Sequence, residues 1–168
     1  MRALALLLIF PLAACAGAER PELARAQPEL RPELFFAGET RGEGVLELAT
    51  GSTRRLSVES RGVPDGAGGL RIDQVIRYDD EEVDRRSWTL RRTGAGYASS
   101  LTEAKGPVTV TRNGNAVNVR YRFGSPTVSM DQWLYLRPDG RTIDNRARVT
   151  LAGVTVAKLT ETITKLAP

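Results

Sequence analysis

Side chains able to carry acid–base chemistry are few in this sequence. It contains no histidine, and Cys15 is its one cysteine, so Ser-His-Asp and Cys-His nucleophile systems are excluded. Zinc prefers thiolate and imidazole ligands, and no disulfide can form within the chain. We therefore expect no catalytic residue, no metal and no cofactor. An enzyme remains the minor alternative, with its acid or base drawn from Asp73, Asp84, Asp131, Tyr135 or Lys158.

Several polar side chains fall on otherwise apolar faces of predicted strands. The alternation over 70–78 puts Gln74 and Tyr78 on the side of its leucine and isoleucines, and the alternation over 143–151 puts Asn145 among isoleucine and valine. A few polar groups in an apolar cavity are typical of a ligand site, and arginine can grip a carboxylate head group. The candidate ligand-binding residues are Gln74, Tyr78, Arg86, Trp88, Gln132 and Asn145.

An internal hydrogen-bond network explains the same residues equally well, because buried polar groups must find partners. In that interpretation Arg86 pairs with a carboxylate such as Asp73 or Asp84 and the network holds the fold together. The two interpretations are compatible, and both stay open at this point.

Strands must position these side chains. From Leu34 onward, period-two alternation and turn signals dominate and no helical stripe is present. Consecutive strands usually pair, and closure into a barrel removes exposed edges, so we predict an all-β, antiparallel up-and-down barrel of about eight to ten strands over 34–168. The candidate strands are Val45–Ala49, Arg55–Ser60, Leu70–Asp79, Val83–Arg92, Tyr97–Glu103, Val108–Arg112, Ala116–Phe123, Val128–Arg137, Arg141–Leu151 and Val154–Leu166.

The strand predicted over 128–137 is apolar on both faces. One face carries a methionine and two leucines, and the other carries Asp131, Trp133 and Tyr135. A barrel strand cannot leave both faces in water, so we expect Leu34–Phe36 to cover the outer one. The alternative is that Asp131, Trp133 and Tyr135 face a lipid surface or a partner protein.

The last predicted strand changes phase along its length. Val154 and Val156 share one parity, whereas Leu159 and Ile163 share the other. A β-bulge near Ala157–Lys158 would restore one continuous inner face.

The N-terminal segment has the pattern of a targeting sequence. Arg2 precedes an apolar run over 3–12 that is too short to span a bilayer, which is typical of a secretory signal. Leu12–Cys15 resembles the bacterial lipobox. That resemblance implies diacylglycerol transfer to the Cys15 sulfur, cleavage before it and acylation of the new N-terminus, with residues 1–14 as a lipoprotein signal peptide.

Residues 15–33 are predicted to be the lipidated cysteine followed by a flexible tether, since this stretch is rich in proline, alanine, glutamate and arginine. In the common sorting rule, Asp after the cysteine retains a lipoprotein in the inner membrane, and this chain has Ala16. We therefore expect a bacterial envelope protein, attached to the membrane through acylated Cys15, at the periplasmic face of the outer membrane.

Four motifs in order resemble a bacterial lipoprotein family known as domain of unknown function 3833. The resemblance implies a calycin- or lipocalin-like barrel and, because members are often encoded near fatty-acid-modifying enzymes, a lipid-related envelope role. The chain departs from the family pattern at Asp79–Asp80, where Asp-Gly is usual, and at Asp131–Gln132, where two aspartates are usual. The matching motifs are Leu34–Gly44, Ile72–Trp88, Asp131–Leu136 and Ile143–Ala147.

The function that these patterns favour is a membrane-anchored barrel binding an apolar, fatty-acyl-type ligand. The alternatives are an envelope scaffold that docks a partner without any ligand and a lipid-modifying enzyme without histidine. Nucleic acid is not an expected partner, because the 24 basic residues interleave with 20 acidic ones rather than cluster. The oligomeric state stays open.

Overall fold

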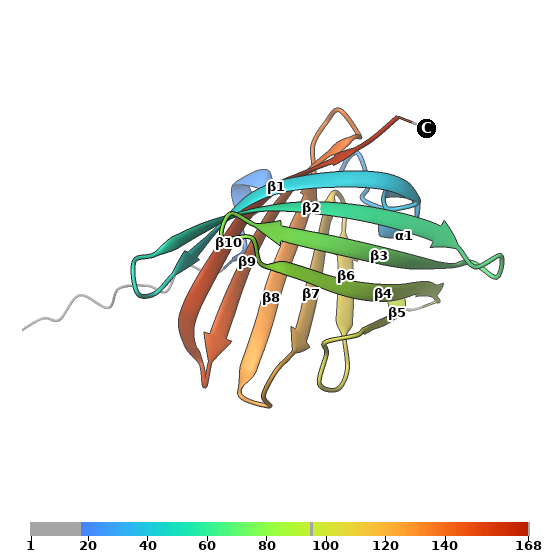
Figure 1. Ribbon diagram of the computed structural model, residues 1–168. Helices are drawn as coiled ribbons and strands as arrows, with labels where there is room; N and C mark the ends of the chain where they lie inside the picture. Colours follow the sequence, from blue (N-terminus) through green and yellow to red (C-terminus); the bar gives the residue numbers. More distant parts are fainter. Residues whose placement is uncertain (1–17, 95, 168) are drawn as a thin grey trace, which may run out of the picture.

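Ten strands and two short helical turns make up the protein in the computed structural model, which describes residues 18–94 and 96–167 (Figure 1). Neither turn in this part of the chain is long and apolar enough to cross a membrane. The predicted signal peptide, residues 1–14, and Cys15 lie outside the described residues. The elements are η1 (Pro21–Leu23), α1 (Pro32–Phe35), β1 (Gly38–Leu48), β2 (Thr53–Pro64), β3 (Gly69–Tyr78), β4 (Val83–Thr93), β5 (Gly96–Leu101), β6 (Thr109–Asn113), β7 (Ala116–Arg122), β8 (Val128–Leu136), β9 (Thr142–Leu151) and β10 (Val154–Lys165).

The strands form one antiparallel sheet in the order β5-β4-β3-β2-β1-β10-β9-β8-β7-β6. Strands β1 and β10 pair along nearly their whole length, so the first and last strands join and the sheet curls into a nearly closed barrel. The remaining seam lies between β5 and β6, where an Ala104–Phe123 bridge and a Lys105 N to Arg122 O bond of 2.7 Å tie the intervening loop to β7. The predicted all-β up-and-down barrel is confirmed.

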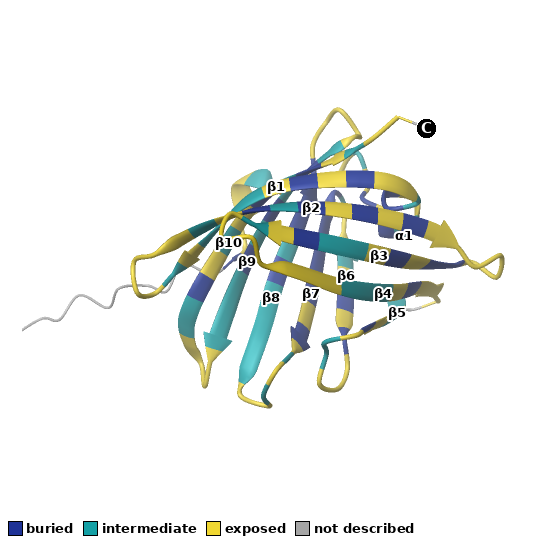
Figure 2. Cartoon of the chain, viewed as in Figure 1, coloured by how far each residue is buried: buried dark blue, intermediate teal, exposed yellow. Residues whose placement is uncertain are grey.

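Alternating burial explains why these segments are strands. On β7, Val117, Val119 and Tyr121 are buried while Arg120 and Arg122 are exposed, which is the pattern of a sheet with one face in a core and one in water. Figure 2 shows the same alternation along β1, β2 and β3.

One strand boundary differs clearly from the sequence-based expectation, and one predicted irregularity is confirmed. Strand β1 begins at Gly38, seven residues before the predicted start at Val45, because glycines weaken strand propensity and hide the pattern. The predicted bulge in β10 is present, with its register shift between Thr155 and Ala157.

The N-terminal segment is docked on the barrel, which differs from the flexible tether expected for 15–33. Leu30 is fully buried in the main core, and its N–H donates to Gly114 O at 2.9 Å. The Arg25 N–H donates to Asn115 Oδ1 at 2.6 Å. The described part of this stretch, residues 18–33, therefore belongs to the folded domain and closes one end of the barrel.

The outer face of β8 is covered, but by a different segment from the one expected. The Arg20 N–H donates to the Tyr135 hydroxyl at 2.7 Å, and Tyr135 stacks on Trp133 with ring centroids 5.9 Å apart. The expected cover, Leu34–Phe36, instead places its two phenylalanines in the main core. The expectation was wrong because α1 turns these rings inward, into the end of the barrel.

Candidate functional site

An internal cavity of about 70 Å³ lies inside the barrel. Its walls come from β1–β5 on one side and from β6, β7, β8 and β10 on the other, and Pro32 and Phe36 of the N-terminal segment reach it. Most of the lining is apolar, which is the usual character of a small-molecule site. The polar side chains that reach the cavity are Ser60, Gln74, Arg86, Ser99, Gln132 and Glu161.

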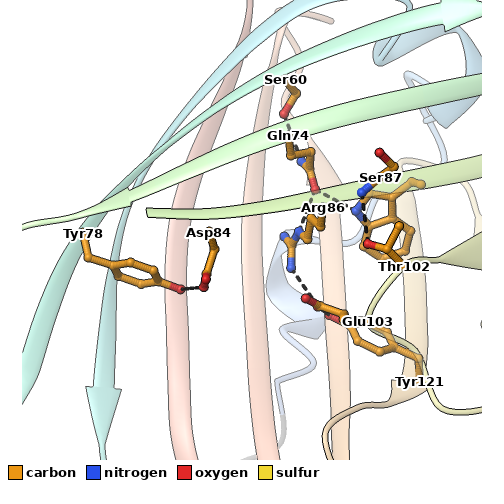
Figure 3. Close-up of polar contacts among 10 residues, drawn as sticks. Ser60, Gln74, Tyr78, Asp84, Arg86, Ser87, Thr102, Glu103 and Tyr121 are labelled. Carbon is orange, nitrogen blue, oxygen red and sulfur yellow. Dashed lines mark hydrogen bonds and ion pairs between the residues drawn. The ribbon is translucent and has the colours of Figure 1, made fainter. Parts of the chain in front are cut away.

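Gln74 is the centre of the polar contacts on the β2–β4 wall (Figure 3). The registers place Ser60 opposite Gln74 and Gln74 opposite Arg86. Gln74 Oε1 accepts from Trp88 Nε1 at 2.6 Å and from Arg86 Nε at 2.8 Å, and Gln74 Nε2 donates to Ser60 Oγ at 2.9 Å. These three bonds fix the orientation of the amide and hold the guanidinium and the indole against one wall.

Arg86 has an ionic partner that the sequence did not indicate. Its Nη1 lies 3.3 Å from Glu103 Oε1, and the Tyr121 hydroxyl donates to the same oxygen at 3.1 Å. Burial of the guanidinium opposes its charge, but Tyr121, Glu103 and a more distant Glu161 outweigh burial and raise the pKa of Arg86. The guanidinium is therefore charged and is balanced within the barrel.

The two carboxylates expected to pair with Arg86 do not do so. Asp73 lies on the outer face, where it accepts from Ser87 Oγ and Arg71, and those hydrogen bonds lower its pKa. Asp84 lies near Tyr78, with 3.5 Å between the hydroxyl and Asp84 Oδ2. The hydrogen-bond network around Arg86 is present, but its carboxylate is Glu103 and not Asp73 or Asp84.

Glu161 is the functional candidate that sequence reasoning missed. Its side chain lies on the inner face of β10, the residue is only 5% exposed, and its Oε2 accepts from Asn145 Nδ2 at 2.6 Å. Burial raises the pKa of this carboxyl, and the Asn145 hydrogen bond and the Arg86 charge oppose that rise only in part. A signal was available, because Glu161 shares the parity of Leu159 and Ile163 in the sequence.

Glycine on the neighbouring strand makes room for this carboxyl. A Cβ added at Gly42 would fall 1.9 Å from Glu161 Oε1, and one at Gly44 would fall 3.0 Å from Glu161 Cβ. Any larger side chain at Gly42 would displace the acid. The same glycines that hide the start of β1 from sequence reasoning are therefore required by the site.

Five of the six predicted ligand-binding residues lie at the cavity or directly behind its lining. Gln74, Arg86, Trp88 and Gln132 line the cavity together, with Gln132 on the opposite wall. Asn145 is fully buried behind Glu161, and supports it without lining the cavity.

The other predicted residues lie elsewhere. Tyr78 lies away from the cluster (Figure 3), with the Arg54 guanidinium 4.0 Å from its ring centroid. Asp131, Trp133 and Tyr135 occupy the outer face of β8, where Asn118 Nδ2 donates to Asp131 at 2.7 Å. No group of three or more metal-ligating side chains occurs within 18–94 and 96–167.

Comparison with known structures shows related barrels at low sequence identity. An S-type phycobiliprotein lyase from Guillardia theta has a TM-score of 0.59 at 11% identity, covering 81% of this chain and 91% of that one. Rv2717c from M. tuberculosis has a TM-score of 0.56 at 18% identity, covering 82% and 99%. These likenesses establish a shared fold and nothing about activity.

A third structure, from a larger protein, agrees with them. A DUF3598-family protein of unknown function from Nostoc punctiforme has a TM-score of 0.62 at 16% identity; the match covers 83% of this chain but only 51% of that one. No curated protein matches the sequence. The family model described as "Protein of unknown function (DUF3833)" matches residues 9–165, nearly the whole chain.

Proposed function

We propose, from the premise that the chain belongs to the DUF3833 family, that it is a binding barrel for a largely apolar small molecule with one polar group. The observation that carries this proposal is the cavity, in which an apolar lining meets Arg86, Gln132 and Glu161. Buried polar groups are costly unless they are hydrogen-bonded or paired, and a few of them in an apolar pocket fix the orientation of a ligand. Envelope lipids and their breakdown products fit this description.

The size of the cavity constrains how a ligand would bind. Sites for drug-sized molecules measure roughly 300–1,000 Å³, whereas this cavity measures about 70 Å³. A polar group and a few carbons fill that space, so a longer chain must extend past it. Two places offer a route: the end closed by Phe36 and the seam between β5 and β6, which has no strand ladder.

A single-tryptophan protein tests the proposal. The chain has two tryptophans, so Trp133→Phe leaves Trp88, which lines the cavity, as the only indole reporter. Titration with a medium-chain amphiphile such as 1-octanol should shift Trp88 emission and saturate at one molecule per chain.

A matched pair of substitutions locates the binding. Val119→Phe fills the cavity, because Val119 lines it and is buried, and should weaken octanol binding at least about tenfold. Val75→Phe makes the same change on the outer face of β3 and should leave binding unchanged. A Trp88 signal that never saturates, or that responds equally to both substitutions, contradicts a cavity site.

We also propose that the protein is a lipoprotein of the bacterial envelope, anchored through acylated Cys15. The support is the lipobox-like Leu12–Cys15, which lies within the 9–165 stretch matched by the family model. Since Ala18 is buried, only Ala16 and Gly17 would separate it from the lipidated Cys15, a reach of about 10 Å of chain. On this proposal the barrel lies at the membrane surface.

Replacement of the anchor residue tests this second proposal. Cys15→Ala should move the protein from the membrane fraction to the soluble fraction and abolish its labelling by a radioactive fatty acid. Continued labelling or unchanged membrane association would contradict the anchor.

A further inference from the structure

We infer that the cavity selects an uncharged hydrogen-bonding head group, such as a hydroxyl, ester or amide, and rejects a carboxylate, with Glu161 as the residue that discriminates. This inference rests on the proposed binding function and names the ligand class for the same site. It reverses the simplest expectation from the sequence, in which Arg86 meets the carboxylate of a fatty acid.

The first argument is that Arg86 offers no unbalanced positive charge. Its Nη1 faces Glu103 at 3.3 Å, and its Nε is committed to Gln74 at 2.8 Å. A buried guanidinium with a partner is a poor acceptor of a second anion, because the second anion must lose its water without gaining a free charge. An incoming carboxylate would compete with Glu103 for the same cation.

The second argument is the acid on the opposite wall. Glu161 is 5% exposed and lines the same cavity as Arg86. A ligand carboxylate would be a third acidic group beside one guanidinium. Because like charges in a desolvated site repel, the site could hold that carboxylate only by keeping it or Glu161 protonated, which costs binding free energy. A ligand ammonium would be repelled by the positive charge of Arg86, which lines the same cavity. An uncharged head group avoids both penalties.

The third argument is that an uncharged side chain in the cavity is free to hydrogen-bond a ligand. Glu161 Oε2 accepts from Asn145, and Glu161 Oε1 lies over Gly42. The Gln132 side chain lines the cavity and has no hydrogen-bond partner within 18–94 and 96–167. An amide both donates and accepts, so Gln132 suits a hydroxyl or a carbonyl.

The surroundings of Glu161 disfavour negative charge. The ionisable groups that act on it are Arg86 from β4, which favours its charged form, and Glu43 from the outer face of β1, which opposes it. Burial exceeds both in effect and raises the pKa of Glu161. Burial therefore disfavours a further negative charge at this place in the cavity.

Matched ligands test the inference without altering the site. In the Trp133→Phe protein, Trp88 emission would be followed during titration with 1-octanol, octanoate and octylammonium, which share a chain and differ in the head group. Octanol should bind about tenfold more tightly than either ion. Octanoate binding as tightly as octanol, or octylammonium binding most tightly, would overturn the inference.

A variant then assigns the discrimination to one residue. Glu161→Gln keeps the shape and removes the ionisable acid, so octanoate affinity should rise about tenfold while octanol affinity changes less than about threefold. Glu59→Gln, an exposed outer-face control, should alter neither. Unchanged discrimination in folded Glu161→Gln overturns the role of Glu161.

The outcomes separate this inference from the function on which it rests. If no ligand of the series shifts Trp88 emission, the binding function fails and the inference fails with it. If all three ligands bind equally and Val119→Phe blocks them all, the binding function stands and only the head-group selectivity fails.

Discussion

Glu161 is buried in a mostly apolar wall, at a cost in free energy. A buried carboxyl is expensive even when it is hydrogen-bonded, and this one also demands glycine at position 42. The Oδ1 atom of its partner Asn145 is itself buried without a hydrogen bond among the described residues. Such local costs are common at functional sites, which supports a role for the acid beyond stability.

The raised pKa of Glu161 predicts how stability responds to pH. The folded state binds the proton more tightly than the unfolded state, whose glutamates titrate near pKa about 4.3. Stability conferred by the neutral acid is therefore complete below about pH 4 and is lost as pH rises toward the folded-state pKa. Glu161→Gln should remove this loss, so over the range pH 4.5–8 its stability relative to the parent should improve with pH until the folded-state pKa is passed, and stay constant above it.

Urea unfolding of both proteins across that range measures the difference directly. Acids common to both proteins, such as Asp73 and Asp144 with their lowered pKa values, cancel in the comparison. A stability difference that is constant with pH would contradict a buried, proton-binding Glu161.

Side-chain alternation predicts half of the site and misses the rest for a clear reason. Gln74, Arg86 and Trp88 are found because each sits on the apolar face of its own strand. Glu103 ends the strand predicted over Tyr97–Glu103 and shares the parity of the buried Leu101, but we did not expect it as a partner of Arg86; in the structure β5 ends at Leu101 and Glu103 follows it. The contact follows from the register of β4 and β5, in which Trp88 faces Leu101, so that Arg86 and Glu103 each lie two residues further along.

The N-terminal segment shows how composition can mislead at the level of an element. Residues 18–33 have the prolines and charges of a linker, yet Leu30 is fully buried. Four backbone and side-chain bonds join this segment to the loop at Asn115 and Gly114. A single leucine among polar residues carries too little periodic signal to reveal that docking.

Two leucines of this segment provide a matched test of the docking. Leu30 is 0% exposed whereas Leu34 is 56% exposed. Leu30→Ala should reduce the free energy of unfolding by about 2–5 kcal/mol through lost burial and a cavity, and Leu34→Ala should change it by less than about 0.5 kcal/mol.

Chemical denaturation of both variants decides between a docked segment and a tether. Equal and small effects of the two substitutions would mean that residues 18–33 are free in solution. A large effect at Leu30 alone would support a barrel whose end is closed by its own N-terminal segment.

At the scale of the whole molecule, the pattern of strands and turns was sufficient to predict the barrel. Ten alternating segments with tight turns leave few alternatives once exposed edges are excluded. The position of the seam between β5 and β6 was not predictable, because it depends on which neighbours fail to pair. The cavity volume was not predictable either, because it is the small remainder after side chains such as Phe36 and Trp88 have packed.

Native mass spectrometry of the gently purified full chain tests the central claim, that the barrel interior is a ligand site, most directly. We expect one small neutral amphiphile per chain in the parent protein and in Val75→Phe, either co-purified or added as octanol, and none in Val119→Phe. A parent protein that carries no ligand and takes up none, or that binds as well after Val119→Phe as before, would contradict the claim.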